Sequence, residues 1–431
     1  MKTYNNPEIE SWNELIQRPV INQKELDQLV NSIIENVKIK GDIALKEYAL
    51  QFDKVTLNNL VVSTEEIEKA KKLVPQELKD AIQIAYENIY IFHKSQEAAE
   101  TVIETTNGVK CWRKSVAIEK IGLYIPGGSA PLFSTILMLG TPAKIAGCNE
   151  VILCTPPSKD GTINPAILYT ADLVGITKVY RVGGAQAIAA MAVGTETIPQ
   201  VYKVFGPGNQ YVTKAKELVQ QMGTAIDMLA GPSEVLIIAD NTCNPEFVAA
   251  DLLSQAEHGP DSQVVLLSDN EDILTKCQMA VQRQVQLLPR KEIALKALEN
   301  SQSIVFNDLE ECIEFSNRYA PEHVILASEN TNSLINKITN AGSVFIGNYS
   351  CESAGDYASG TNHTLPTNGF AKNYSGVSLD SFVKKITFQE LSKQGIENIG
   401  EAIEIMAEAE GLFAHKSAVT LRLNEIRNDK N

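Results

Sequence analysis

The sequence predicts an α/β protein with two lobes, each built around a mostly parallel sheet. From about residue 116, short β-branched runs alternate with helical segments, which is the pattern of βαβ units. This alternation continues far enough to supply two sheets of similar size. The chain has 431 residues, of which 44% are apolar, so it can bury a large core and is too long for one ordinary domain.

The first hundred residues are mostly helical in pattern. Residues 24–37 are amphipathic, and Ser63-Thr-Glu-Glu66 has the form of a capping box that opens a helix. Pro75 ends that helix, and a second one is expected to run to about Gln96.

The strands that follow are expected in two groups. The first group comprises residues 116–125, 150–154, 178–182, 202–205 and 234–239. The second group comprises residues 263–267, 303–306, 323–326 and 343–346. The Gly/Ser-rich stretch 348–373 is long and irregular, which favours a functional loop over a linker. From Leu379 to the end, only helices are expected.

Charge and hydropathy limit the classes of partner. The chain has 38 basic and 53 acidic residues and a net charge of −15, which disfavours nucleic acid and anionic membranes. The N-terminus has no apolar signal region, and no run of about 18 apolar residues occurs. We therefore expect a soluble cytoplasmic protein with no nucleic-acid or membrane partner.

The cysteines suggest neither a disulfide framework nor a thiolate metal site. There are seven, scattered along the chain and never arranged as Cys-x-x-Cys. Each is expected to be a small buried hydrophobic residue. One alternative is a thiol-dependent aldehyde oxidiser in which Cys148 or Cys111 is the nucleophile.

Four of the five histidines lie in the C-terminal half, each within a few residues of a carboxylate or amide. They are His258, His323, His363 and His415. Imidazole is a common neutral metal ligand and titrates near pH 7, so this pattern favours a metal-dependent or acid/base enzyme. The fifth, His93, lies on a helical surface pattern and is expected to be structural.

The surroundings of these histidines suggest separate tasks. Gln255 and His258 lie three apart near the end of a helical pattern and could bind one ion, although His258 could instead cap the helix. Asp356 and His363 share a polar loop with no helical or strand periodicity, which suits either ligand binding or turn hydrogen bonds.

Glu322 and His323 open a buried strand. Their alternate directions would allow different tasks in acid/base chemistry, while a solvated strand end is the alternative.

The C-terminal tail has an apolar stripe with little to bury it. His415 shares a helical face with Val419, Leu423 and Ile426, so another subunit is the expected partner. Gly411 separates Glu410 from His415 and is expected to break the helix.

Three glycine strings stand at strand-to-helix junctions and could hold phosphate, although tight turns explain them better when each is taken alone. They are Pro126-Gly-Gly-Ser-Ala-Pro, Val182-Gly-Gly-Ala-Gln and Phe205-Gly-Pro-Gly-Asn. None has the Gly-x-Gly-x-x-Gly fingerprint. In Gly206-Pro-Gly208-Asn-Gln-Tyr the third glycine is missing, and no acidic residue ends the next strand at the expected spacing.

Eight longer motifs occur in order along the chain: Leu-Tyr124-Ile-Pro-Gly-Gly-Ser-Ala-Pro-Leu, Gly-Gly-Ala-Gln186-Ala-Ile-Ala, Phe-Gly-Pro-Gly-Asn209, Ala-Gly-Pro-Ser233-Glu-Val, Asp-Leu-Leu-Ser-Gln255-Ala-Glu-His258-Gly-Pro-Asp-Ser-Gln, Pro-Glu322-His323, Glu-Ser-Ala-Gly-Asp356-Tyr-Ala-Ser-Gly-Thr-Asn-His363 and Ala-His415-Lys. Taken together and in this order, they closely resemble the histidinol dehydrogenase family over about residues 20–425.

The resemblance implies an enzyme of histidine biosynthesis that oxidises L-histidinol to L-histidine through the aldehyde and reduces two NAD. It implies one zinc ion per subunit, held by residues matching Gln255, His258, Asp356 and His415. The same donor set is compatible with manganese or cobalt, so ligand chemistry alone does not choose the metal.

The resemblance also assigns the remaining site positions. Substrate-binding positions match Ser233, His323, His363 and Glu410, together with the four metal ligands. NAD-binding positions match Tyr124, Gln186 and Asn209. His323 would accept the hydroxyl proton in the first oxidation, and Glu322 would activate water for the second.

The resemblance further implies two Rossmann-like lobes of the aldehyde-dehydrogenase type in a homodimer with shared active sites. The expected divisions are an N-terminal helical arm at 1–22, a lobe with the catalytic and zinc residues at 23–123 and 234–376, an NAD-binding lobe at 124–233, and a helical tail at 377–431 that crosses to the other subunit. The helical N- and C-terminal segments would mediate dimerisation.

Two other functions stay open besides thiol chemistry. One is a family relative that oxidises a different alcohol or diol with the same zinc and NAD apparatus. The other is a zinc hydrolase in which Glu322 activates water without NAD.

Overall fold

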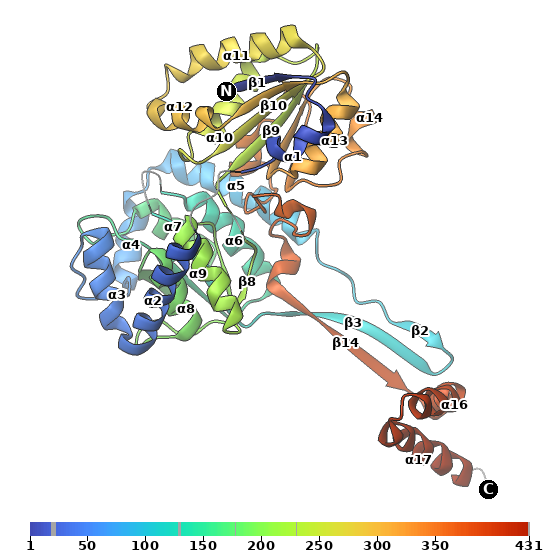
Figure 1. Cartoon of the computed structure of the whole chain (residues 1–431). Helices are drawn as coiled ribbons and strands as arrows, with labels where there is room; N and C mark the ends of the chain where they lie inside the picture. Colours follow the sequence, from blue (N-terminus) through green and yellow to red (C-terminus); the bar gives the residue numbers. More distant parts are fainter. Residues whose placement is uncertain (19–22, 128–130, 177, 230, 430–431) are drawn as a thin grey trace. The chain divides into compact units, whose positions relative to one another are not determined.

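The structure, a computed structural model of the chain, describes residues 1–18, 23–127, 131–176, 178–229 and 231–429 (Figure 1). It divides into two compact units. The first comprises residues 1–96 and 118–382, and the second comprises residues 97–117 and 383–431.

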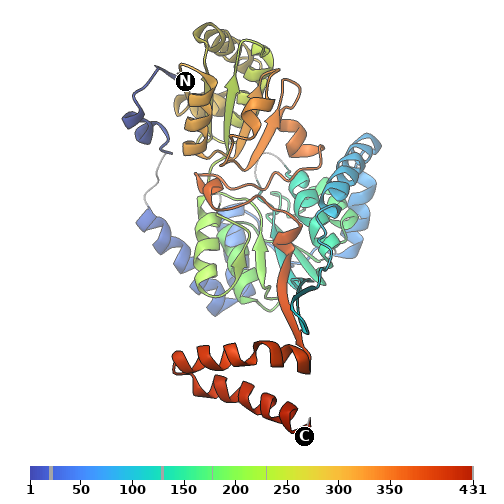
Figure 2. The ribbon, with the colours of Figure 1, turned by 90° about the vertical axis from the view of Figure 1, so that its right-hand side faces the viewer.

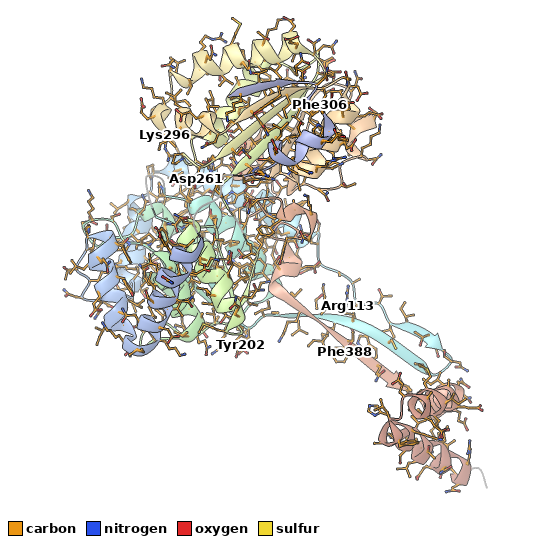
Figure 3. The ribbon with its side chains drawn as sticks, viewed as in Figure 1. Arg113, Tyr202, Asp261, Lys296, Phe306 and Phe388 are labelled. Carbon is orange, nitrogen blue, oxygen red and sulfur yellow. The ribbon has the colours of Figure 1, made fainter. Side chains whose placement is uncertain are left out.

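A six-stranded parallel sheet forms the centre of one lobe of the first unit. Its strands in spatial order are β1 (Lys2–Asn5), β11 (Gln302–Val305), β10 (Gln263–Ser268), β9 (Glu234–Ala239), β12 (His323–Ala327) and β13 (Ser343–Ile346). One face packs on α10 (Pro245–Ala256), α11 (Glu271–Val285) and α12 (Lys291–Glu299). The other packs on α1 (Trp12–Leu15), α13 (Leu309–Tyr319) and α14 (Asn332–Ile335), with Phe306 in its core (Figure 3).

A five-stranded parallel sheet forms the centre of the other lobe. Its strands in spatial order are β6 (Lys178–Arg181), β5 (Glu150–Thr155), β4 (Lys120–Tyr124), β7 (Lys203–Phe205) and β8 (Ala225–Ile226). One face packs on α2 (Gln23–Lys40), α3 (Asp42–Tyr48), α8 (Gly184–Val193) and α9 (Gln210–Gln221). The other packs on α4 (Thr64–Leu73), α5 (Gln76–Lys94), α6 (Phe133–Ala146) and α7 (Pro165–Leu173).

The two-sheet α/β architecture confirms the prediction from alternating strands and helices. The expected grouping was wrong at residues 234–239, which were placed with the first group of strands but form β9 of the six-stranded sheet. Strands that are covered on both faces carry near-continuous apolar runs, which made them visible in the sequence. The capping box is also confirmed: the Ser63 side chain accepts from the Glu66 backbone, and the Glu66 side chain accepts from the Ser63 backbone.

The division of the N-terminal half between the lobes was predicted wrongly. Residues 23–123 were expected with residues 234–376, but buried residues of α2 and α3 share a core with Cys154 and Tyr180 of the five-stranded sheet. An amphipathic helix shows which of its faces is buried but not which sheet buries it.

The expected helical arm at 1–22 also needs correction. It begins with strand β1, which pairs in parallel with β11 at the edge of the six-stranded sheet. A short 3-10 helix (Ile9–Ser11) and α1 follow, so the arm completes the sheet.

The second unit contains strands that the sequence analysis missed. β14 (Val383–Leu391), β3 (Val109–Ala117) and β2 (Ile103–Thr106) form an antiparallel sheet, so the prediction of helices alone after Leu379 was wrong. The rings of Trp112 and Phe388 stack with centroids 5.4 Å apart, and Figure 3 labels Phe388 and Arg113 on the two paired strands. These strands are largely exposed, so no buried face revealed them in the sequence.

The tail stripe is buried within its own unit. α16 (Lys393–Ala409) and α17 (Phe413–Asp429) lie side by side (Figure 2), and Val419, Leu423 and Ile426 are buried residues of α17. This stripe therefore does not require a second subunit, contrary to the expectation. The helix break at Gly411 is confirmed, since this residue has a φ of +72° between the two helices.

Among the described residues, no helix combines the length and the apolar composition needed to cross a membrane.

A buried ion pair supports the loop between β7 and α9. Lys216 and Asp227 pair with almost no exposure, while the Asp227 carboxylate accepts from the Gly206 N–H at 2.8 Å and Lys216 donates to the Gly206 carbonyl at 3.0 Å.

Replacing Lys216 with Met should lower the free energy of unfolding by about 3–5 kcal/mol, because Asp227 is left buried without a counter-charge. Urea denaturation followed by circular dichroism measures the change, with Lys276→Met on α11, whose side chain is 56% exposed, as the comparison. Equal stability of the two variants would contradict the expectation.

Candidate active site

The predicted acid, base and ligand residues of the first unit meet at the amino edge of the six-stranded sheet. Glu322 and His323 stand where β12 begins, and Glu234 opens the neighbouring strand β9. Helix α10 returns from the opposite edge and brings Gln255 and the following His258 to the same place. This topology places Glu234 and Glu322 side by side although they are 88 positions apart in the sequence.

Glu322 and His323 are both buried and converge on one amide. The Gln255 Nε2 donates to Glu322 Oε2 at 3.2 Å and lies 3.5 Å from His323 Nδ1. The Glu322 Oε2 and His323 Nδ1 atoms are 3.7 Å apart. The expectation that the two side chains point in different directions was therefore wrong, because Glu322 precedes the regular strand. The solvated strand end is also excluded, since Glu322 is 7% exposed.

Glu234 fixes this pair through its backbone. Its N–H donates to Glu322 Oε2 at 2.9 Å, and its carbonyl accepts from His323 Nδ1 at 3.1 Å. Its own carboxylate is held by both Nε and Nη2 of Arg18, each at 2.9 Å. With Nδ1 donating, His323 has its free lone pair on Nε2, which is buried and has no hydrogen-bond partner among the described residues.

A second group of ligand atoms lies beside the pair. His258, Glu352 and Asp356 each offer an atom within 4.8 Å of the others, and Asp356 Oδ1 is 3.9 Å from His323 Nε2. Both acids belong to the short helix α15 (Glu352–Tyr357), which corrects the prediction of an irregular loop at Asp356. Sequence reasoning missed Glu352. Its spacing of four residues before Asp356 was the available signal, because that spacing places both carboxylates on one helix face.

His363 and its neighbours join the two lobes of the first unit. His363 Nδ1 donates to the Asp356 carbonyl at 2.8 Å, and its Nε2 lies 3.1 Å from the Thr135 hydroxyl on α6. The adjacent Asn362 donates to the Met138 carbonyl at 2.6 Å and lies 3.3 Å from His93 Nε2. His93 is fully buried, so its role is structural as predicted but its expected surface position was wrong.

Desolvation is the main cause of the pKa shifts in the site. Desolvation raises the pKa of Glu322 and of Glu352 well above the usual value, and nearby Asp356 raises both further. Burial raises the pKa of Asp251, beside Glu352, to about 6. Desolvation lowers the pKa of His258 and of His323, so both rings are neutral at pH 7.

These residues fit a divalent cation. Gln255 Oε1 and Glu352 Oε1 are buried without hydrogen-bond partners among the described residues, as is His323 Nε2. Unpaired buried oxygens and clustered carboxylates are costly unless a cation or a ligand satisfies them. Neutral imidazole, amide oxygen and carboxylate are suitable ligands for zinc and for related metals.

Three predicted substrate or metal positions are not part of this cluster as described. Ser233 precedes Glu234 and accepts through its carbonyl from the Gln263 N–H at 3.1 Å. Glu410 follows α16, and His415 lies in the first turn of α17. Both are exposed residues of the second unit, so their joining the site stays a prediction.

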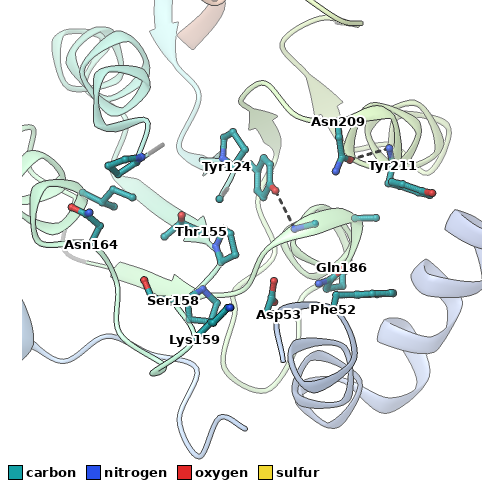
Figure 4. Close-up of a pocket in the computed structure, with 18 of the residues that line it drawn as sticks. Phe52, Asp53, Tyr124, Thr155, Ser158, Lys159, Asn164, Gln186, Asn209 and Tyr211 are labelled. Atoms are coloured by element: carbon teal, nitrogen blue, oxygen red, sulfur yellow. Dashed lines mark hydrogen bonds between the residues drawn. The ribbon is translucent and has the colours of Figure 1, made fainter. Parts of the chain in front are cut away.

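The three predicted cofactor positions line one cavity of about 840 Å³ in the five-stranded lobe (Figure 4). Tyr124 ends β4 and accepts from the Gly184 N–H at 3.1 Å, and Gln186 lies in the first turn of α8. Asn209 caps α9 by accepting from the N–H groups of Tyr211 and Val212. The glycine strings that begin at Val182 and Phe205 thus border this cavity, as do Pro126 and Gly127 of the string that begins at Pro126. Residues 128–130 of that string lie outside the described residues.

The thiol alternative gains no support from its candidate residues. Cys148 donates from Sγ to the Phe382 carbonyl at 3.7 Å, and burial raises the pKa of its thiol to about 11. Such a thiol is protonated at neutral pH and is a poor nucleophile. Cys111 lies on β3 of the second unit.

Comparison with known proteins gives one consistent family. The family profile described as histidinol dehydrogenase matches residues 16–423. A histidinol dehydrogenase of Bacteroides thetaiotaomicron is 58% identical over 99% of this chain and 100% of its own length. One from Escherichia coli K12 is 52% identical over 98% of both chains.

A crystal structure of histidinol dehydrogenase from Elizabethkingia anophelis superposes with a TM-score of 0.97. It is 61% identical in sequence, and the match covers 99% of each chain. The matched length includes both parallel sheets and the residues clustered at the amino edge of the six-stranded sheet. These residues are Gln255, His258, Glu322, His323, Glu352 and Asp356. The chain therefore belongs to the histidinol dehydrogenase family of oxidoreductases.

Proposed function

We propose that this chain oxidises L-histidinol to L-histidine through L-histidinal, using a zinc ion and two NAD, in the last steps of histidine biosynthesis. The observation that carries the proposal is the convergence of a buried acid/base pair with unpartnered ligand atoms of Gln255 and Glu352, beside His258 and Asp356. Family membership supplies the substrate, because the relatives are histidinol dehydrogenases.

Four residues would hold the metal: Gln255, His258, Asp356 and, from the partner subunit, His415. The Gln255 amide is already oriented, because its Nε2 donates to Glu322 and leaves Oε1 free. Glu352 lies close enough to His258 and Asp356 to contribute its charge. A bound ion would fix the amine and imidazole of the substrate and so orient the carbinol carbon toward the nicotinamide.

His323 would accept the hydroxyl proton of the substrate in the first oxidation. Its Nδ1 is committed to the Glu234 carbonyl, and its lowered pKa keeps Nε2 unprotonated at pH 7. As the proton moves to Nε2, hydride leaves the carbinol carbon for NAD, and the products are the aldehyde and NADH.

Glu322 would activate water for the second oxidation. The Glu322 carboxylate removes a proton from water as the water oxygen attacks the aldehyde carbon, giving the anion of the aldehyde hydrate and protonated Glu322. Transfer of hydride from this anion to NAD gives a second NADH and the carboxylic acid, which ionises to the carboxylate of histidine, while Glu322 returns its proton to solvent. The hydrogen bonds from the Glu234 N–H and from Gln255 hold Oε2 and favour the ionised form of this buried acid.

Three residues would bind the substrate besides those already assigned: Ser233, His363 and Glu410 of the partner subunit. His363 is held by the Asp356 carbonyl and the Thr135 hydroxyl, one from each lobe. The cavity with Tyr124, Gln186 and Asn209 would bind NAD, because its volume is typical of cofactor pockets and two helix N-termini border it.

The function is tested by NADH production from L-histidinol before and after chelation, with metal content measured on the same sample. We expect two NADH per histidinol, loss of activity with the metal, and recovery when zinc is added. NADH from another amino alcohol but not from histidinol would support the relative with a different substrate. No NADH from any alcohol would support the hydrolase.

We further propose a homodimer in which His415 completes the site of the partner subunit. Mixed dimers test this directly. His258→Ala and His415→Ala variants should each be inactive as homodimers, but a mixed dimer would hold one site with both substitutions and one intact site.

After denaturation and joint refolding in equal amounts, about a quarter of wild-type activity is expected, because half of the dimers are mixed and half of their sites are intact. NADH formation measures it, and each variant refolded alone is the control. No recovery in the mixture, from dimers shown to exchange subunits, would place both residues in the same chain's site.

A further inference from the structure

Two segments that precede the five-stranded sheet in the sequence also line its cavity: Leu29 and Ile33 of α2, and the segment that contains Phe52 and Asp53. Most of its lining follows β4, β5 and β6 or opens α8 and α9, as expected for a nucleotide site. Phe52 and Asp53 enter instead from the end of a π-helix (Ala49–Asp53) that follows α3. Figure 4 shows both side chains together at the cavity with Ser158 and Lys159 of the loop after β5.

Asp53 is the single carboxylate among the described residues that line this cavity. Its Oδ2 is buried and has no hydrogen-bond partner in the described part of the chain. Burial also raises the pKa of this carboxyl group. Lys54 turns the chain away with a φ of +59°, and the Val55 N–H closes the turn on the Ala49 carbonyl at 3.2 Å, so the backbone that carries Asp53 is fixed beside the cavity.

An unpartnered carboxylate in a cavity calls for a ligand with hydroxyl or amine donors. In parallel α/β nucleotide sites, an acid at the end of the second strand accepts from the hydroxyl groups of the adenosine ribose. Here the second strand, β5, ends in Thr155-Pro156-Pro157, which offers no carboxylate. Asp53 supplies at this cavity the acid that is missing from the sheet.

We propose that Asp53 accepts hydrogen bonds from the adenosine ribose of NAD and thereby excludes NADP. This rests on the proposed NAD-dependent function and adds its cofactor specificity. The 2′-phosphate of NADP would lose the hydroxyl donor and place its negative charge against a fixed carboxylate. Lys159 also lines the cavity but is exposed, so solvent and salt screen its attraction for a phosphate more than they screen the repulsion from the buried Asp53 oxygen.

The test compares Asp53→Asn with wild type at saturating L-histidinol, varying NAD or NADP. We expect the substitution to raise KM for NAD about 10-fold or more, through loss of a charge-assisted hydrogen bond. The ratio of kcat/KM for NAD over NADP should fall at least as much. The KM for histidinol and the zinc content should not change.

Asp160→Asn is the matched control. This exposed acid is near the same loop but does not line the cavity, and its Oδ1 acceptor for Thr162 is kept by asparagine. It should leave the NAD to NADP ratio unchanged, which separates the local contact from net charge.

The proposal would be overturned if Asp53→Asn kept the wild-type KM for NAD and the wild-type ratio of kcat/KM for NAD over NADP. The proposed function would still hold in that case, provided that the wild type forms NADH from histidinol. No NADH formation by the zinc-loaded wild type would instead refute the proposed function. Titration of NAD and NADP onto both proteins without substrate provides the second measurement. Equal loss of affinity for both dinucleotides would also count against ribose selection.

Discussion

Glu322→Gln should nearly abolish oxidation of L-histidinal while leaving oxidation of L-histidinol close to wild type. Glutamine has the same shape and keeps an oxygen that can accept from the Glu234 N–H, so the site stays assembled. It cannot take a proton from water. We expect the aldehyde step to slow by about 10²–10⁴-fold, the usual contribution of a general base.

The two steps are separated by the substrate supplied. NADH formation from histidinal measures the second oxidation, and single-turnover NADH formation from histidinol with an aldehyde trap measures the first. His323→Gln is the comparison variant and should slow the first step. Equal losses in both steps for Glu322→Gln would refute the division of labour between the two residues.

The raised pKa of Glu322 also predicts the direction in which the rate of the aldehyde step changes with pH. Burial raises the pKa of Glu322, and the base must be ionised to act, so the wild-type aldehyde step should slow as pH falls through that raised pKa. The Glu322→Gln variant should lack this acidic limb.

His258→Ala should lose the metal and most of the activity together. His258 is the one imidazole in the ligand group that the structure assembles with Glu352 and Asp356, and its lowered pKa keeps it neutral and ready to bind. Its loss leaves oxygen donors alone in the first unit, which bind zinc less well. We expect at least about a 10³-fold fall in turnover, corresponding to the several kcal/mol that a metal contributes.

Metal content by mass spectrometry and NADH formation on the same sample measure both effects. His93→Asn is the matched control, because it removes a histidine that contacts the Ile89 carbonyl and Asn362 outside the ligand group. It should lower thermal stability but keep the zinc. A His258→Ala protein with one zinc per subunit would exclude His258 as a ligand.

Local signals predicted those parts of the fold that local interactions decide. The capping box at Ser63 and Glu66 involves residues three apart, so the sequence contains the whole interaction. Buried parallel strands such as β9 and β10 are apolar along their length, which makes them visible without knowledge of their neighbours. The helix break at Gly411 follows from a single residue.

Partners distant in sequence were not predictable in the same way. β14 pairs with β3 across about 270 residues on two largely exposed surfaces, so neither strand had a buried face to mark it. Glu352 stands four residues before Asp356, a spacing that indicates only a shared helix face, and Asp53 ends a short π-helix. Only the packing shows that their carboxylate oxygens are buried without partners.

The sequence by itself determined the α/β class, most of the strands and five residues of the cluster at the amino edge, because strand composition and the ordered motifs contain that information. These residues are Gln255, His258, Glu322, His323 and Asp356. The tertiary structure alone decided which sheet α2 and α3 cover, how Glu322 and His323 converge on Gln255, and where Asp53 enters the cavity. The physical reason is that amphipathicity and burial specify which face of an element is covered, whereas the identity of the covering element depends on packing between segments far apart in the chain.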